Sequence, residues 1–350
     1  MEFFGKRVLI TGGTGYLGTY LANYLFSKGF SVRIFDLLEC RDNDYTGKVE
    51  FVKGDVRNYD LLSDATKEVD YVVHAAAAAP YRDSRTIYSI AIQGTLNIFK
   101  ASEKNGVDRV VYISSTAVYG FQKEMPIKET APCLGVGSHA ESKKIAENIC
   151  ASYRKDGMVV PVLRPRPLVG AGRLGVFQIL FDWIKDNKRI PVIGAGTNKC
   201  QLLDSEDLVE AILLSIVSSK DKANDVFNLG NEKFASLNED LAELIKEVNS
   251  KSRLVHFPAS PVKFMLKIFE KFSLSPLYEG AYGIIDKNLN VSVDKIKQQL
   301  GWSSNRSNAE SLIRAYNWFQ KHCHELGRES GKTNKGVFEQ GVLNIIKKVF

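Results

Sequence analysis

The first half of the chain alternates short apolar runs with longer stretches whose apolar positions recur at helical spacing. The runs rich in β-branched residues predict strands, and the amphipathic stretches between them predict helices. The expected strands are 7–11, 31–35, 49–52, 71–74, 109–113 and 159–163. The expected helices are 16–27, 59–65, 84–105 and 140–155. Strands that alternate with helices in this way predict an α/β fold with a doubly wound parallel sheet and helices on both faces.

The second half of the chain is less regular. A strand and turn are expected at 190–196, and the expected helices are 177–186, 205–218, 238–249, 261–272, 293–300 and 308–322. Apolar residues make up 44% of the 350 residues, enough for a substantial core. No apolar run approaches the roughly 20 residues that a membrane-spanning helix needs.

Charge and cysteine content narrow the function classes. The net charge of +7 is spread along the chain rather than gathered in a block, so no nucleic-acid partner is expected. The five cysteines are an odd, scattered set without metal-ligand spacing, and the histidines do not group with them. We therefore expect no metal, no disulfide framework and a reducing compartment. The first strand starts almost at once, which leaves no room for a leader and makes a cytoplasmic location the expectation.

The strongest local signal is a glycine-rich turn between the first expected strand and the first expected helix. It reads Thr11-Gly12-Gly13-Thr14-Gly15-Tyr16-Leu17-Gly18. Gly12 permits the tight turn, Gly15 lets the backbone approach a pyrophosphate, and Gly18 allows close packing of the helix. The free N–H groups at the helix N-terminus face the anion. The pattern predicts a dinucleotide here, and a tight turn without a ligand is the alternative.

Further cofactor contacts are expected where the next strands end. Asp36 ends the second strand, where a carboxylate accepts hydrogen bonds from the adenosine ribose. This favours NAD over NADP, because a 2′-phosphate would meet a like charge, although nearby Arg41 softens that preference. Asp55 and Val56 follow the third strand, and the small residues Ala75, Ala76 and Ala77 follow the fourth, where bulk would collide with the cofactor.

In this order, these segments resemble the extended short-chain dehydrogenase/reductase superfamily, the group of NAD-dependent epimerases/dehydratases and 3β-hydroxysteroid dehydrogenase-like proteins. The resemblance covers about residues 6–325, and it also rests on Gly94-Thr95-Leu96-Asn97, Ser114-Ser115-Thr116, Ser142-Lys143, Leu163-Arg164-Pro165 and Leu300-Gly301-Trp302. It implies a Rossmann-type fold with a smaller C-terminal substrate-binding region. The implied domains are 1–170 for NAD binding, 171–325 mainly for substrate, and 326–350 as a polar linker and amphipathic tail. The implied partners are a small-molecule substrate and a second copy of the chain in a homodimer.

The resemblance also implies catalytic roles by position. Ser115 would hydrogen-bond the reacting oxygen, Lys143 would hold the nicotinamide ribose and lower the pKa of an acid/base, and Pro165 would lie near the nicotinamide carboxamide. The family places a tyrosine one helical turn before the lysine, and this chain has His139 there. Histidine transfers protons near neutral pH. Three interpretations stay open: His139 is a substituted acid/base, another group such as Tyr119 carries the proton, or catalysis is lost.

The substrate is less well defined. The nucleotide-sugar branch usually has an asparagine where this chain reads Pro165-Arg166-Pro167, which favours the steroid dehydrogenase-like branch. Arg166 is interpreted as a solvated charge rather than a phosphate clamp. The expected function is an NAD(P)-dependent oxidoreductase or isomerase that acts on a secondary alcohol or ketone by hydride transfer. The alternatives are a nucleotide-sugar 4-epimerase or dehydratase, and a non-catalytic NAD-binding subunit or assembly factor.

Two basic amphipathic segments, 261–273 and 337–350, suggest contact with a surface. In the first, Lys263, Lys267 and Lys271 fall at i, i+4 and i+8 and make a basic stripe beside apolar positions. Such helices lie in a lipid headgroup layer, or they cover a core or a subunit interface. Peripheral membrane association is therefore an additional expectation.

Overall fold

The computed structural model describes residues 3–40, 44–79, 82–173, 175–271, 283, 285–324 and 347. Its centre is a seven-stranded sheet in the order β10-β6-β5-β4-β1-β2-β3, in which every pairing is parallel. The strands are β1 (Arg7–Thr11), β2 (Ser31–Asp36), β3 (Glu50–Lys53), β4 (Tyr71–His74), β5 (Arg109–Ile113), β6 (Val162–Pro165) and β10 (Val226–Leu229). This is the predicted Rossmann-type doubly wound sheet.

Two expected strands differ from the structure by one residue at one or both ends, and the start of β6 was predicted wrongly by three residues. Residues 159–163 were expected to form a strand, but β6 begins only at Val162. Val159 makes an isolated bridge to Arg109. Pro161 lies between Val159 and Val162 and has no N–H to donate, so the hydrogen-bond ladder between β5 and β6 is interrupted there.

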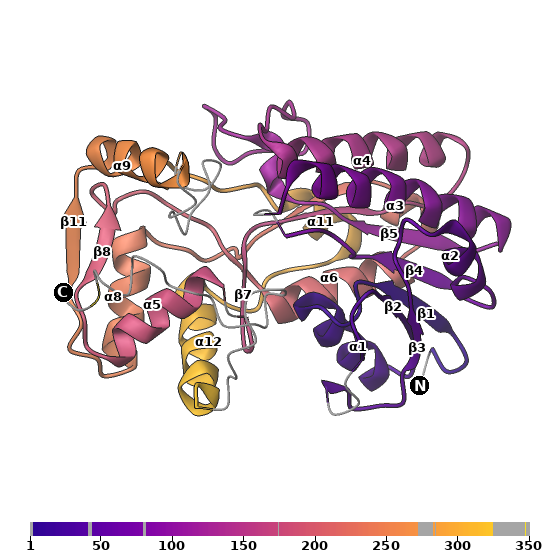
Figure 1. Ribbon diagram of the computed structural model, residues 1–350, viewed down its shortest axis with the longest axis horizontal. Helices are drawn as coiled ribbons and strands as arrows, with labels where there is room; N and C mark the ends of the chain where they lie inside the picture. Colours follow the sequence, from indigo (N-terminus) through magenta and orange to yellow (C-terminus); the bar gives the residue numbers. More distant parts are fainter. Residues whose placement is uncertain are drawn as a thin grey trace.

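Helices cover both faces of this sheet (Figure 1). One face carries α2 (Tyr59–Ala65), α3 (Ser84–Lys104) and α4 (Ser138–Lys155), and the other carries α1 (Tyr16–Ser27), α6 (Ser205–Val217) and α11 (Asp294–Leu300). In β1, Val8 and Ile10 pack into the core with α1 and α6, whereas Leu9 packs into the core with α2 and α3. Successive strand residues point to opposite faces, so burial of both faces explains the continuous apolar run.

A smaller group of elements lies beyond the carboxyl ends of the strands, on the left in Figure 1. It contains α5 (Val176–Lys185), α8 (Leu237–Glu247), α9 (Ala259–Lys271), α12 (Asn308–His322) and the parallel pair β8 (Ile190–Ile193) and β11 (Leu254–Phe257). The remaining short elements are the 3-10 helix Thr116–Tyr119 after β5, the parallel pair β7 (Leu168–Val169) and β9 (Leu203–Asp204), and α7 (Lys220–Ala223) between α6 and β10. A third core cluster around Phe181, Trp183 and Tyr316 holds α5 to α12. The helices predicted in this half are present, with ends shifted by no more than two residues.

Among the described helices, none is long and apolar enough to cross a membrane. The predicted C-terminal tail at 326–350 lies outside the described residues, except for Lys347.

Candidate active site

The turn between β1 and α1 has two positions that only glycine fits. Gly12 has a φ of +73°, and a Cβ placed there would lie 2.9 Å from the backbone of Ala76. A Cβ at Gly18 would lie 2.3 Å from the carbonyl oxygen of Gly12. The turn and the small residues after β4 are therefore in close contact.

This turn has the features of a dinucleotide cradle. Helix α1 begins after Gly15, whose position carries no side-chain cap, so the first N–H groups of the helix stay available. The hydroxyl of Thr14 is buried and makes no hydrogen bond to any described residue. Asp36 at the end of β2 accepts hydrogen bonds from the backbone N–H groups of Thr14, at 3.0 Å, and Leu38, at 3.2 Å. These residues fit a bound diphosphate and ribose.

A continuous cavity of about 2200 Å³ runs from this cradle into the smaller group of elements. All the predicted site residues line it: Gly12, Thr14, Gly15, Tyr16, Leu17, Gly18, Asp36, Asp55, Val56, Ala75, Ala76, Ala77, Ser115, His139, Lys143 and Pro165. Among them, the side chains of Tyr16 and Asp55 are held by protein partners. The Tyr16 hydroxyl bonds Ser205 at 2.7 Å, which ties α1 to α6, and Asp55 forms an ion pair with Arg57.

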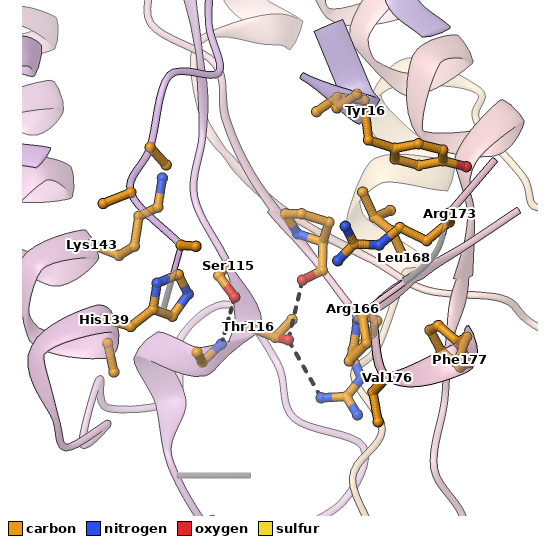
Figure 2. A pocket seen from close by; sticks show the side chains of 18 of the residues that line it. Tyr16, Ser115, Thr116, His139, Lys143, Arg166, Leu168, Arg173, Val176 and Phe177 are labelled. Atoms are coloured by element: carbon orange, nitrogen blue, oxygen red, sulfur yellow. Dashed lines mark hydrogen bonds between the residues drawn. The ribbon is translucent and has the colours of Figure 1, made fainter. Parts of the chain in front are cut away.

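Helix α4 places His139 and Lys143 on the same side of the cavity. Residues four apart face the same way on a helix, and Figure 2 shows the two side chains next to each other. The Lys143 ammonium donates a hydrogen bond to the carbonyl oxygen of Ile113 at 2.6 Å and lies 4.9 Å from the ring centre of Tyr112. Burial lowers the pKa of Lys143 to about 8, so the group is still mostly charged at pH 7.

The His139 imidazole is neutral at pH 7. Burial, and then the positive charge of Lys143, lower its pKa to about 4. The ring makes no hydrogen bond to any residue that the structure describes. It points toward Ser115, whose Oγ accepts a hydrogen bond from the N–H of Ala117 at 3.1 Å (Figure 2). A free base and a free hydroxyl proton therefore face the same part of the cavity.

Tyr119, the alternative proton carrier, does not reach the cavity. Its side chain is fully buried, and its hydroxyl donates to Oδ1 of Asn228 and accepts from Nη1 of Arg164, each at 2.7 Å. Burial raises the pKa of Tyr119 to about 12. The hypothesis that Tyr119 transfers the proton is therefore wrong.

A buried ion pair that the sequence did not reveal fixes the position of α4. Arg164 on β6 pairs with Glu147 on α4, with Nε 2.9 Å from Oε1. Ser114, directly before Ser115, also donates to Glu147. The ion pair thus links α4 to the ends of β5 and β6. Charged side chains 17 residues apart gave no sequence signal of pairing.

Arg166 differs from its interpretation as a solvated charge. It is only 7% exposed and lines the cavity. Its backbone N–H bonds the carbonyl oxygen of Leu229, so the residue continues the pairing of β6 with β10 and its side chain is enclosed. Nε donates to the carbonyl oxygen of Gln201 at 3.0 Å, and Nη1 lies 3.4 Å from the hydroxyl of Thr116.

The apolar residues of helix α9 face two different environments, the cavity and the solvent. Val262 and Leu266 line the cavity, whereas Phe264 and Ile268 are 68% and 40% exposed. Lys263 of the predicted basic stripe forms an ion pair with Asp286. The stripe is therefore partly neutralised within the protein.

The described residues contain no cluster of three or more His, Cys, Asp or Glu side chains that could hold a metal ion. All five cysteines are free thiols, and burial raises the pKa of Cys150.

The comparison with known proteins identifies the family. The model of the NAD dependent epimerase/dehydratase family matches residues 8–230. An uncharacterized protein of Sinorhizobium fredii, y4nG, is 32% identical over 343 residues, which cover 97% of this chain and 85% of that protein. The chain therefore belongs to the NAD-dependent epimerase/dehydratase family. It is an NAD-dependent enzyme, which confirms the predicted superfamily and cofactor.

Two similar proteins are named as sugar epimerases. A putative UDP-glucose 4-epimerase of Methanocaldococcus jannaschii is 30% identical over 252 residues, covering 68% of this chain and 81% of that protein. The crystal structure of a UDP-glucose 4-epimerase from Thermotoga maritima, with UDP-glucose, has the same fold, with a TM-score of 0.75 at 22% identity. That match covers 91% of this chain and 99% of the other.

Proposed function

We propose that this enzyme is a nucleotide-sugar 4-epimerase, the alternative that the sequence placed behind a more general oxidoreductase. The observation that carries the proposal is the position of a neutral His139, which makes no hydrogen bond to a described residue, facing Ser115 in the cavity that continues from the dinucleotide cradle. The names of the relatives support the sugar substrate, against the proline that replaces the usual asparagine. NAD, when bound, supplies a hydride acceptor that later returns the hydride.

Ser115 is the proposed donor to the reacting oxygen. The N–H of Ala117 occupies a lone pair of its Oγ, so the hydroxyl proton is free for an acceptor in the cavity. As the substrate C–O bond becomes C=O, this hydrogen bond keeps the oxygen in place. Gly12, Gly15, Thr14 and Asp36 would hold the cofactor at the other end.

His139 is the proposed proton carrier. The neutral imidazole takes the hydroxyl proton while the C4 hydrogen leaves with its electron pair, which gives a ketone. In the second half-reaction the imidazolium returns the proton to the oxygen, and the hydride returns to the opposite face of C4. Each proton taken is given back, so a base with a pKa of about 4 needs no reloading from solvent. Burial and, second to it, the charge of Lys143 keep the resting imidazole neutral.

The direct test is product analysis. The NAD-loaded protein is incubated with UDP-glucose, UDP-N-acetylglucosamine and UDP-glucuronic acid, and each product is identified by proton NMR. We expect a 4-epimer from at least one of them, without lasting absorbance at 340 nm, because the cofactor ends in the form in which it started. Net accumulation of reduced cofactor with a ketone product would instead indicate the oxidoreductase.

We also propose a cytoplasmic homodimer with peripheral membrane contact through α9 or the C-terminal segment. The exposed Phe264 and Ile268 and the net positive charge support contact with an anionic headgroup layer. Flotation with anionic vesicles tests this, with neutral vesicles as the control. Light scattering after gel filtration tests the dimer.

A further inference from the structure

Arg166 is a buried cation that lines the substrate cavity. The reaction proposed above gives this cation no anionic partner. Its guanidinium donates to the carbonyl oxygen of Gln201 and to the hydroxyl of Thr116, neither of which carries a charge, and it lies beside Cys200. No described carboxylate lies within ion-pair distance of it. A buried charge without a counter-ion is costly, because hydration is lost and nothing replaces it.

The other buried arginines among the described residues show how their charges are compensated. Arg164 pairs with Glu147, and Arg33 pairs with Glu50. Arg109 also lacks a carboxylate among the described residues, but its guanidinium donates to the carbonyl oxygens of Ser215 and Ser218 at the C-terminal end of α6. The negative end of that helix dipole stabilises the charge. Arg109 does not line the cavity, whereas Arg166 does.

The position of Arg166 indicates which part of a substrate it meets. Its Nη1 contacts Thr116, the residue directly after Ser115, and Figure 2 shows the guanidinium on the opposite side of Thr116 from His139. An anion held by this guanidinium would lie next to Thr116, the neighbour of Ser115 in the chain. A second arginine, Arg173, lies farther along the wall, 5.6 Å from the ring centre of Tyr16 at the start of α1.

We propose that Arg166 binds a carboxylate carried by the sugar ring, so that the preferred substrate is a nucleoside-diphosphate uronic acid. The planar guanidinium offers a fork of N–H groups that matches the two oxygens of a carboxylate. One buried positive charge is matched by the single negative charge of that group. The inference rests on the proposed 4-epimerase function and adds the class of sugar.

The first experiment compares UDP-glucuronic acid with UDP-glucose in the wild type, Arg166→Met and Arg166→Lys. The measured quantities are kcat and KM for epimerisation. We expect the wild type to have a KM at least about tenfold lower for the uronic acid, as for one charge-assisted hydrogen-bonded pair. Arg166→Met should remove this preference, and Arg166→Lys should keep part of it. The control is Arg109→Lys, which alters a buried arginine outside the cavity and should keep the preference.

Two results overturn the inference. If Arg166→Met weakens both substrates by the same factor, the arginine binds the diphosphate that they share. If it weakens neither, the arginine binds no substrate anion.

A second measurement separates this inference from the proposed function. The NAD-loaded proteins are melted in sodium acetate and in sodium chloride of equal ionic strength, so that acetate is the free carboxylate. We expect acetate to raise the unfolding midpoint of the wild type and of Arg109→Lys, but not of Arg166→Met. If no nucleotide sugar is converted, the proposed function fails while this comparison still decides whether Arg166 binds a carboxylate. An equal effect of acetate on Arg166→Met contradicts it.

Discussion

His139 and Lys143 lie one turn apart on α4, and the buried ammonium of the lysine helps to keep the imidazole uncharged. Burial is the larger cause of the lowered pKa of His139, and the charge of Lys143 is the second. The family uses a tyrosine at this position, whose active base is an anion that a lysine stabilises. With a histidine, the active base is the neutral imidazole. The positive charge of the lysine then disfavours the protonated form instead of stabilising an anion.

The pH dependence of kcat/KM should show the titration of both His139 and Lys143. The pKa of His139 is about 4 and that of Lys143 about 8, so we expect kcat/KM to rise with pH through the first value and fall above the second. Lys143→Met removes the charge that disfavours imidazolium, so the acidic limb should move to higher pH. An acidic limb that stays in place would show that Lys143 does not affect the titrating base.

Replacing His139 with tyrosine should change the profile in a different way. A phenol must lose its proton to act as a base, and its ordinary pKa is about 10. Lys143 lowers that pKa, but we still expect the acidic limb of His139→Tyr to lie well above that of the wild type. The measurement is kcat/KM from pH 4 to 10 for both proteins. If the two limbs coincide, the limb belongs to another group.

The cofactor cradle and the sheet could be predicted from the sequence because their signals are local. The glycines from Gly12 to Gly18 and the apolar run of β1 are contiguous, and the conformation of each follows from its own residues. The state of Arg166 could not be predicted, since its burial depends on pairing with β10, more than 60 residues away. The fully bonded hydroxyl of Tyr119 likewise depends on Asn228.

Acid should destabilise the protein through His74. This side chain is buried between Thr11 and Thr95, and burial lowers its pKa from 6.5 to about 3. The folded state therefore binds fewer protons than the unfolded state, so the contribution is complete above pH 6.5 and is lost as pH falls toward 3. His74→Gln should flatten the dependence of the unfolding free energy on pH in this window. The same substitution at an exposed position, His256→Gln, is the control for the change of side chain.

Removing one partner of the buried ion pair between Glu147 and Arg164 should lower the stability of the folded protein. Their side chains are 9% and 7% exposed, so Glu147→Gln leaves a buried guanidinium without its counter-charge. We expect a loss of roughly 3 kcal/mol in the free energy of unfolding, measured in urea. The exposed Glu103→Gln on α3 should change stability by less than about 0.5 kcal/mol. Equal effects of the two changes would contradict a stabilising role for the pair.

The central claim is that His139 transfers the proton in an NAD-dependent reaction. The most direct measurement is the epimerisation rate of His139→Ala, purified with its NAD content checked, with and without added imidazole. We predict at least about a hundredfold loss of kcat with NAD retained, and partial recovery in imidazole as the free base fills the vacated position. A His139→Ala enzyme that keeps the wild-type rate would contradict the account.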